Sequence, residues 1–415
     1  MNENFMMIAE HYTPKGFNML KKVILLISLL ILLLFFMYRA KSDSFMASNS
    51  IINVPENSPT IQSAINSANS GDIIHVGAGV HKELLKINKT IQLIGEDPHI
   101  TTIDGGDAGA VITITASDVQ IQGFTIKGGR GEEPYAGVLV YECYNVTISD
   151  NLIEENYKGI DLLNSNGCKV FNNTVINNLY AGIKVFGNNN DFYDDIIANN
   201  TNGVVISGST VPNTFYHNNF IGNKNHVLVY VQTMWDNGVE GNYWSDYVGT
   251  DTDMDGVGDQ EYPLTGDRYP LMGTFTNFAI QYKSQRHFLF IICNSTISNF
   301  HFVESNKTIN FNVLGRNGTI GFCRIAIPTT LTMELWQGDY VVLINGNSAT
   351  NTRTWASSTH DYCYITYAHT IAAQNVSIAS GSEENTFFPL ILTIAIGIPI
   401  ILIVAILMLR KKRIF

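Results

Sequence analysis

A short acidic segment contains the residues whose types and spacing point most directly to chemistry. Residues 251–259 read Asp-Thr-Asp-Met-Asp-Gly-Val-Gly-Asp. Carboxylates at alternate positions, a glycine that permits a sharp turn and a backbone carbonyl at the seventh position are typical of calcium loops. The sequence therefore predicts a calcium site with these ligands: Asp251, Asp253, Asp255, the carbonyl of Val257, Asp259 and Glu261. The alternative is an acidic turn whose carboxylates are solvated.

Two features separate this segment from an EF-hand calcium sensor. The last ligand position of an EF-hand loop is occupied here by Tyr262 instead of glutamate, and the flanking sequence has no helical pattern. We therefore expect a structural ion that stabilises the end of the domain that precedes the loop.

A pair of adjacent carboxylates is a weaker candidate for catalysis. Asp194 and Asp195 are followed by His217, and polysaccharide hydrolases use clustered carboxylates. Both aspartates, however, occupy positions that hold asparagine in neighbouring repeats, which predicts turn residues. We expect a non-catalytic protein, and a polysaccharide hydrolase or lyase is the alternative.

Aromatic side chains that can stack on sugar rings form a third group of candidates. They are Tyr135, Tyr157, Tyr180, Tyr193, Tyr243 and Trp244. Regularly stacked coils present such rings along a flat face that suits an extended polymer. For Tyr243 and Trp244 the alternative is packing beneath the last coil. The predicted partner is a polysaccharide or a cell-surface glycan.

A sequence repeat positions most of these residues. Asp150, Asn172, Asp194 and Asn218 begin equivalent segments, with steps of 22, 22 and 24 residues between them. Each repeat contains short stretches of alternating apolar residues separated by Asn, Asp and Gly, which indicates strands joined by tight turns. The pattern predicts an all-β fold, a right-handed parallel β-helix over residues 47–272 with the acidic loop at 249–262 near its end.

Asparagine recurs in a second phase of the repeat, at Asn156, Asn178 and Asn200. Stacked side-chain amides can form ladders of hydrogen bonds, and we expect such a ladder here. Ahead of the repeats, residues 58–68 predict a short helix that caps the open end of the solenoid, with Ser58 as its N-cap.

The sequence pattern changes after the repeats. Residues 273–380 contain alternating stretches such as 308–313, 340–344 and 362–367, which predict a small antiparallel β-sandwich. Three of the five cysteines lie in this segment: Cys293, Cys323 and Cys363. One pair of them can be bridged outside the cell, and the sequence leaves open which pair.

Two apolar runs frame the chain. The first, residues 23–38, predicts a signal peptide or an uncleaved signal anchor within residues 1–46, and the sequence leaves both open. The second, residues 387–409 within the terminal segment 381–415, predicts a transmembrane helix. The basic residues 410–413 behind it predict a cytoplasmic C-terminus, so the bulk of the chain is expected outside the cell membrane.

The charge balance bears on the class of partner. Asp and Glu number 36 against 25 Lys and Arg, and the formal net charge is −11. An acidic surface disfavours nucleic acid and suits divalent cations and neutral sugars.

The opening of the repeat region, the Asn-rich repeats and the block from Gly-Asn-Tyr-Trp at 241–244 to Tyr-Pro-Leu-Met at 269–272 resemble the NosD-like β-helix proteins. The resemblance covers residues 51–272. It implies a periplasmic or surface location, with saccharide handling or copper delivery, because the family is named after a periplasmic protein that assists copper-centre assembly. The segment that follows resembles the membrane-proximal β-domains of archaeal surface proteins.

Copper is not expected from the residues themselves. The histidines show no ligand spacing such as His-X-His, and the outer methionines are isolated. A NosD-like accessory protein for a copper site is kept as an alternative function.

Overall fold

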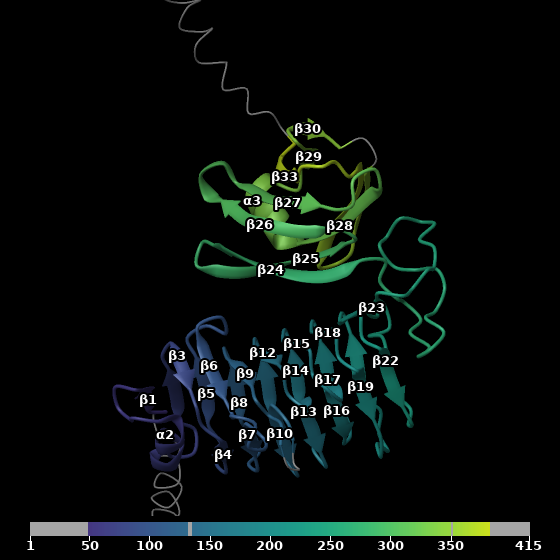
Figure 1. Cartoon of the computed structure of the whole chain (residues 1–415). Coiled ribbons are helices and arrows are strands. Elements are labelled where there is room, and N and C mark those ends of the chain that lie inside the picture. The colour runs from purple at the N-terminus through teal and green to yellow at the C-terminus, as the bar shows by residue number, and fades with distance from the viewer. Residues whose placement is uncertain (1–48, 132–134, 350–351, 382–415) are drawn as a thin grey trace, which may run out of the picture.

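The computed structural model describes residues 49–131, 135–349 and 352–381. It has two parts, a parallel β-solenoid and, above it, two antiparallel sheets (Figure 1). The predicted all-β solenoid followed by antiparallel sheets is therefore confirmed. The predicted signal segment 1–46 and the predicted transmembrane helix 387–409 lie outside the described residues. Among the described residues, no helix has the length and apolar character needed to span a membrane.

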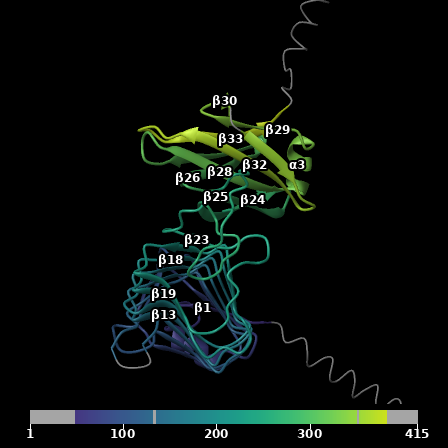
Figure 2. The same cartoon turned by 90° about the vertical axis from the view of Figure 1, so that its right-hand side faces the viewer.

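Three parallel sheets form the walls of the solenoid, and Figure 2 looks along its stacked coils. Sheet A contains β1 (Ile51–Val54), β2 (Ile73–Val76), β5 (Gln92–Gly95), β8 (Gln120–Gln122), β11 (Thr147–Ser149), β14 (Lys169–Phe171), β17 (Asp191–Tyr193) and β20 (Thr214–Tyr216). Sheet B contains β3 (Gly79–His81), β6 (Thr101–Asp104), β9 (Thr125–Lys127), β12 (Leu152–Glu154), β15 (Thr174–Ile176), β18 (Ile196–Ala198), β21 (Asn219–Ile221) and β23 (Tyr243–Trp244). Sheet C contains β4 (Leu85–Ile87), β7 (Ile112–Ile114), β10 (Val138–Tyr141), β13 (Lys158–Leu163), β16 (Ala181–Phe186), β19 (Asn202–Ile206) and β22 (Asn225–Val229).

Side chains alternate between the two faces of each short strand, so every coil places an apolar side chain at the same position of the core. Ile148, Val170, Phe192 and Phe215 are paired in register on successive strands of sheet A, and all four are fully buried. The rings of Phe192 and Phe215 stack with centroids 4.2 Å apart. The 22-residue period is thus the length of one coil, because it brings equivalent apolar residues into contact.

Buried asparagines connect the coils at the turns. The side-chain oxygen of Asn178 accepts the backbone N–H of Asn156 at 3.1 Å, and Asn200 accepts that of Asn178 at 2.9 Å. The predicted ladder is confirmed, and it continues to Asn223. A second ladder between sheets A and B contains Asn151, Asn173, Asp195, Asn218 and Asn242.

The capping helix is present but begins later than predicted. Helix α2 spans Ile61–Ser67, and its N-cap is Thr60, whose hydroxyl accepts the N–H of Ser63 at 3.1 Å. Ser58 is not the N-cap, because the N–H of Ser63 is bound by Thr60. The hydroxyl of Ser58 instead contacts the hydroxyl of Ser63 at 2.5 Å. The carboxylate of Glu83 accepts the free N–H groups of the first turn, which fixes the helix against the first coils.

Two five-stranded antiparallel sheets follow the solenoid, and we call this part the sandwich. Sheet D contains β24 (Thr274–Tyr282), β25 (Gln285–Cys293), β28 (Ile320–Pro328), β32 (His360–Ala368) and β31 (Thr352–Ala356). Sheet E contains β26 (Thr296–Val303), β27 (Thr308–Leu314), β33 (Gln374–Ser380), β29 (Tyr340–Ile344) and β30 (Asn347–Ser348). A 3-10 turn, η1 (Glu304–Asn306), joins β26 to β27.

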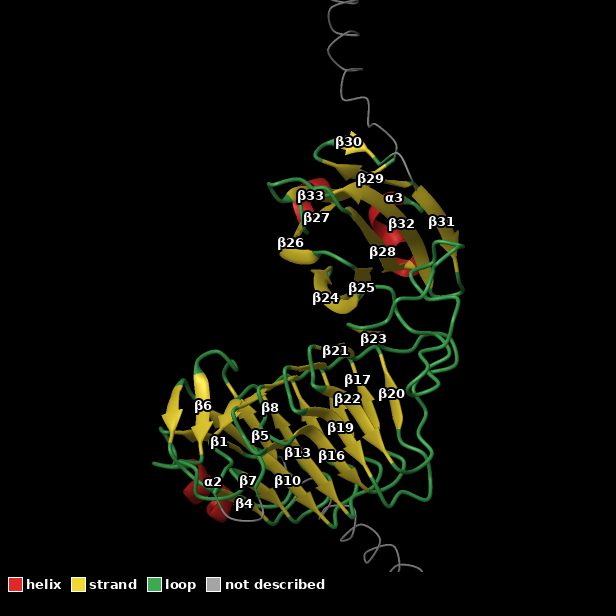
Figure 3. Ribbon diagram, turned by 45° about the vertical axis from the view of Figure 1, so that its right-hand side comes forward, coloured by secondary structure: helices red, strands yellow, loops and turns green. Residues whose placement is uncertain are grey.

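One helix of the sandwich was not expected from the sequence. Helix α3 (Thr329–Trp336) follows Pro328 and buries Leu331, Leu335 and Trp336 in the core shared by the two sheets (Figure 3). The stretches on either side of this segment alternate apolar and polar residues, and for that reason the sequence predicted strands throughout this region. The core contacts of these three side chains stabilise the helix.

Candidate functional site

The acidic segment lies in a long loop that joins the solenoid to the sandwich. This loop, residues 245–272, follows β23 and precedes β24, and we call it the end loop (Figure 3). Leu271 N–H donates to the carbonyl of Asn242 at 2.8 Å, and Gly258 N–H donates to the carbonyl of Pro270 at 2.7 Å. The first bond holds the loop against the last coil, and the second joins two segments of the loop to each other.

Three of the predicted calcium ligands lie together. One ligand oxygen from each of Asp251, Asp253 and Asp255 lies within 4.8 Å of the others. The carboxylate of Asp251 accepts the N–H groups of Asp255 and Gly256 at 3.0 and 2.9 Å, which folds the segment back on itself. The arrangement concentrates negative charge at one point of the loop.

The electrostatics of this cluster favour a cation. Burial raises the pKa of Asp251 and of Asp255, and repulsion by the neighbouring carboxylates raises both further, although backbone N–H donors oppose the rise. Like charges that share a site disfavour ionisation of one another, and a bound cation removes that penalty.

The two other predicted carboxylate ligands lie outside this cluster. The carboxylate of Asp259 accepts the N–H and hydroxyl of Thr252 at 2.9 and 2.6 Å, and these hydrogen bonds lower its pKa. The side chain of Glu261 is exposed and lines a neighbouring pocket. The N–H of Val257 donates to Asp255 at 2.8 Å, so this residue stays beside the cluster. The structure therefore brings together three carboxylates out of the predicted set.

An open pocket of about 360 Å³ lies in the same loop. It is lined by residues 246–249 and 260–264. Two hydrogen bonds join its lining residues: the hydroxyl of Tyr247 donates to the carbonyl of Gln260 at 2.5 Å, and Tyr262 donates to Asp246 at 2.9 Å. The side chains of Val248 and Leu264 are 94% and 69% exposed. The pocket thus combines an aromatic ring, exposed apolar groups and hydrogen-bonding oxygens.

The end loop also contacts the sandwich. Arg353 of β31 lies 3.5 Å from the carboxylate of Asp253 and donates to its carbonyl. Gly256 packs on Arg324 of β28: a Cβ at this position would lie 3.2 Å from the Cβ of Arg324, and its φ is +84°. Glycine is therefore required both by the backbone conformation and by the close approach of the sandwich.

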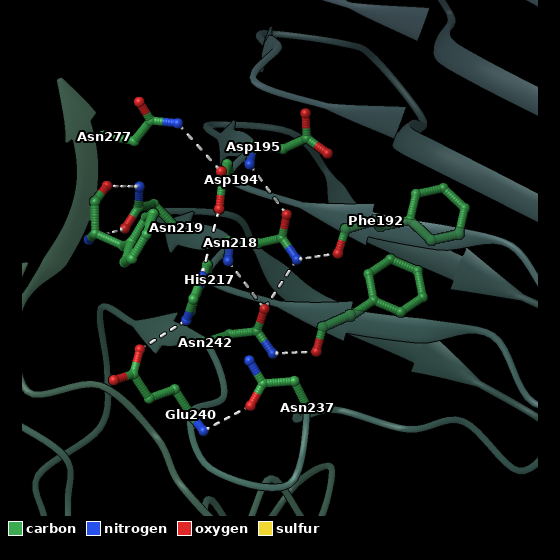
Figure 4. A network of polar contacts seen from close by, with 12 residues as sticks. Phe192, Asp194, Asp195, His217, Asn218, Asn219, Asn237, Glu240, Asn242 and Asn277 are labelled. Atoms are coloured by element: carbon green, nitrogen blue, oxygen red, sulfur yellow. Dashed lines mark hydrogen bonds and ion pairs between the residues drawn. The ribbon is translucent and has the colours of Figure 1, made fainter. Parts of the chain in front are cut away.

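The catalytic candidates Asp194 and His217 lie at the junction of the two parts (Figure 4). His217 Nε2 is 2.7 Å from Glu240, and its Nδ1 is 3.5 Å from Asp194. The imidazole stacks on Phe275 of β24 with ring centroids 4.0 Å apart. The sandwich therefore covers this histidine, and the pair contributes to a contact between the two parts of the chain.

Buried charges complete this junction. Although burial alone would lower the pKa of His217, its hydrogen bonds to Asp194 and Glu240 raise it. Burial would raise the pKa of Glu240, but Arg324 and His217 hold it far below its usual range. Glu240 and Arg324 were not predicted, because they are 84 residues apart and neither stands in a recognisable pattern.

Asp195, the third catalytic candidate, faces the interior of the solenoid. It is fully buried and occupies an asparagine position in the second ladder, between Asn173 and Asn218. The turn role predicted for Asp194 and Asp195 agrees with these positions, since Asp194 has the left-handed backbone, with φ +60°, of a tight turn.

The predicted sugar-stacking residues lie in different parts of the solenoid. Tyr157 and Tyr180 stack with centroids 5.4 Å apart, and Tyr135 meets Tyr157 edge-on at 5.3 Å. Tyr193 stacks between Phe171 and Tyr216 on sheet A. The stacked rings, Tyr157 on Tyr180 and Tyr193 on Phe171 and Tyr216, cover one another's faces along the solenoid.

Trp244 and Tyr243 lie at the last coil. Trp244 is fully buried between Phe220 and Tyr262 and donates to Asp267 at 2.9 Å. Neither face of its ring is open to a sugar. Tyr243 is half-buried beside Leu271. Both positions correspond to the alternative of packing beneath the last coil.

The donor set of the cluster suits a hard cation. Within residues 49–131, 135–349 and 352–381, Asp251, Asp253 and Asp255 form the one group of three or more His, Cys, Asp or Glu side chains with converging ligand atoms. Carboxylate oxygens suit calcium and magnesium, whereas copper sites use imidazole, thiolate or thioether ligands. The cluster does not fit copper.

Comparison with known proteins agrees with this architecture. Residues 61–249 match the family model described as periplasmic copper-binding protein (NosD). A probable ABC transporter binding protein NosD of Pseudomonas aeruginosa is 30% identical over 152 residues, which is 34% of this chain and 32% of that protein. A cell surface glycoprotein of Methanothermus fervidus is 29% identical over 138 residues, which is 33% of this chain and 18% of that protein.

Solved structures add only a distant likeness. Pectin methylesterase PemA from Erwinia chrysanthemi aligns with 49% of this chain and 73% of its own chain, at 15% identity and a TM-score of 0.30. Nothing about this chain follows from so low a score. The sequence matches are firmer, although the chain spans only 32% of the length of the NosD relatives. Together with the three parallel sheets, they identify residues 61–249 as a NosD-like parallel β-helix.

Proposed function

We propose that this chain is a non-catalytic cell-surface protein that binds saccharide at its end loop, and that a calcium ion stabilises this loop. The observation that carries the proposal is that a single loop contains the converging carboxylates Asp251, Asp253 and Asp255 and also lines the open pocket. Concave sites with an aromatic side chain and a few polar groups are the usual form of small-ligand sites.

The surface location rests on the NosD-like solenoid and on the cell surface glycoprotein among the relatives. In this proposal the apolar run 387–409 anchors the chain in the membrane, with the basic residues 410–413 in the cytoplasm. The sandwich then stands next to the membrane and the solenoid faces outward.

Calcium in the loop acts on the junction between the two parts. Asp251, Asp253 and Asp255 supply oxygen ligands, and water with the Val257 carbonyl completes the set that calcium requires. Because Arg353 contacts Asp253 from the sandwich, an ion that orders this segment also orders the sandwich against the solenoid.

The pocket is a better sugar site than the rows of tyrosines. In the rows, stacked neighbours such as Tyr157 and Tyr180 cover each other's faces. In the pocket, the half-buried ring of Tyr247 and the exposed side chain of Leu264 can contact the apolar face of a sugar. Glu261 and the backbone oxygens of the rim can accept hydrogen bonds from its hydroxyl groups.

Calcium binding is tested by thermal unfolding of the full chain in EDTA and then in calcium. A ligand that binds only the folded state raises its stability by about 2.7 kcal/mol at a hundredfold excess over Kd. We expect the calcium-dependent rise in Tm to be lost in Asp253→Asn/Asp255→Asn. The control Glu142→Gln/Glu155→Gln removes two exposed charges from the solenoid and should keep the rise. Equal Tm values of the unmodified chain in EDTA and calcium would exclude the ion.

Saccharide binding is tested separately, with a panel of neutral and acidic polysaccharides presented to the full chain in calcium. Leu264→Arg places a charged side chain at the rim of the pocket and should abolish retention. Leu314→Arg, at a position 42% exposed on the sandwich, should retain it. If both variants bind a polysaccharide as the unmodified chain does, the pocket is not the site.

A further inference from the structure

Three cysteines lie on adjacent strands of the sandwich and face its core. Cys293 of β25, Cys323 of β28 and Cys363 of β32 are all buried. Their side chains share the apolar space between the two sheets. Buried cysteines on adjacent strands are either inert core thiols or partners in a disulfide. The pairing register of their strands distinguishes these two cases.

Cys293 and Cys323 are directly opposite each other on antiparallel strands, and their sulfur atoms are 2.6 Å apart. Non-bonded heavy atoms normally rest about 3.5–4.0 Å apart, whereas bonded sulfurs are about 2.05 Å apart. The two side chains thus point at one another at a separation that suits a bond better than two thiols. We propose that Cys293 and Cys323 form a disulfide that joins β25 to β28.

The third cysteine is excluded from this pair by its register. Cys323 faces Ile365 on β32, and Cys363 faces Ile325, so Cys323 and Cys363 are diagonal neighbours. Diagonal neighbours in a sheet are about 7–8 Å apart, beyond the about 4.4–6.8 Å between Cα atoms that a disulfide spans. Cys363 remains a thiol, and so do Cys143 and Cys168 in the core of the solenoid.

Polar groups lie close to the two sulfurs. The hydroxyl of Tyr367 lies 3.3 Å from Cys323 and 3.5 Å from Cys293, and it contacts Ser295 at 2.8 Å. Ser295 in turn contacts His369 at 2.7 Å. Burial would raise the pKa of Cys293, but hydrogen bonds from Cys323 and Tyr367 lower it, whereas burial raises the pKa of Cys323.

The oxidant is a disulfide, either of a thiol–disulfide oxidoreductase or of a small molecule such as oxidised glutathione. The thiolate of one of the two cysteines attacks one of its sulfurs, forms a mixed disulfide and releases one thiolate. The thiolate of the other cysteine then attacks the sulfur of the first and releases the second thiolate. Two protons leave the cysteines, and the two electrons reside on the two released thiols. Oxidising surroundings follow from the proposed surface location.

The timing of oxidation follows from burial. Both sulfurs are inaccessible in the folded sandwich, so exchange takes place before the core closes. Once formed, the bond is shielded from reductant by the same core. The native chain should therefore resist dithiothreitol until a denaturant is added.

The test is a count of thiols in the full chain after refolding in a glutathione redox buffer, which sets the redox conditions whatever the natural location. The denatured chain is alkylated before and after reduction and digested for mass spectrometry. Of five cysteines, we expect three to be alkylated before reduction, and one linked peptide pair that contains Cys293 and Cys323. The control Cys363→Ser should keep this pair. Cys323→Ser should leave all its remaining cysteines open to alkylation.

Two results would overturn the proposal. One is alkylation of every cysteine of the refolded chain without reduction. The other is a linked peptide that contains Cys363 in place of either partner. Neither readout requires calcium or saccharide, so failure here is distinct from failure of the proposed function.

Discussion

The guanidinium of Arg324 in the sandwich pairs with the carboxylate of Glu240 at the end of the solenoid, and both side chains are largely buried, with 4% and 13% of their surface exposed. Glu240 also binds His217. The two parts of the chain are therefore joined by a buried ion pair in addition to the hydrogen bonds between Asn219 and the backbone of Phe275. Charges buried in this way make the junction sensitive to the loss of either partner.

We expect Arg324→Met to destabilise the chain by about 3–5 kcal/mol, because it removes the guanidinium partner of the buried Glu240 carboxylate and leaves only His217 beside it. The measurement is urea unfolding followed by circular dichroism. The matched control is Lys283→Met, which removes an exposed ion pair between the turn after β24 and Glu334 of helix α3 and should cost about 0–1 kcal/mol. If the two variants unfold at the same urea concentration, the buried pair does not hold the junction.

The stability of the junction should depend on pH through His217. The titratable and charged groups around it are Asp194, Tyr216, Glu240 and Arg324. Because the folded pKa of His217 is raised above 6.5, its contribution is complete below that pH and is lost as pH rises through the folded value. Glu240 behaves oppositely: its lowered pKa gives a contribution that is present above 4.5 and is lost as pH falls through the folded value.

This dependence predicts a fall in Tm as pH rises above 6.5, and the fall should be absent in His217→Gln. The measurement is Tm against pH for both chains, from mildly acidic to alkaline buffers. The exposed His301 provides the control His301→Gln, which should follow the unmodified chain. A His217→Gln curve parallel to the unmodified one would mean that the imidazole does not titrate within the junction.

Periodicity made the solenoid predictable, because each coil repeats the same contacts with its neighbours. The ladder of Asn156, Asn178 and Asn200 could be derived from spacing alone, since residues one coil apart must stack. The strands at 308–313 and 340–344 were likewise visible as alternating patterns, and they occur as β27 and β29.

The junction and the details of the end loop could not be derived in this way. Arg324 and Glu240 meet only because the sandwich packs on the end of the solenoid, and no local sequence pattern predicts that contact. The spacing of the calcium motif predicted that Asp259 and Asp251 bind the same ion. Spacing alone, however, does not show where the chain reverses its direction. The hydroxyl of Thr252 binds Asp259 and removes it from the cluster.

The second asparagine ladder contains one residue that does not suit its place, and this gives the last prediction. Asp195 accepts the backbone N–H of Asn173 at 2.8 Å, as an asparagine would, but its other oxygen is buried without a hydrogen-bond partner. In the equivalent rung, the amide nitrogen of Asn173 donates to the carbonyls of Ile148 and Phe171. A carboxylate oxygen in that position cannot donate, and burial raises the pKa of Asp195 well above its usual value.

We therefore expect Asp195→Asn to stabilise the chain by about 1–3 kcal/mol at neutral pH, which is the usual cost of an unsatisfied buried polar group. Because the folded pKa of Asp195 is raised, its ionisation lowers the free energy of unfolding. This loss is complete above the folded pKa and disappears as pH falls below the unfolded value of 3.8. The gain from the substitution, measured by urea unfolding, should shrink toward acid pH. The reverse change Asn173→Asp should destabilise, because it places a second carboxylate next to the first. A gain that does not vary with pH would show that the ionisation of Asp195 is not the source of the penalty.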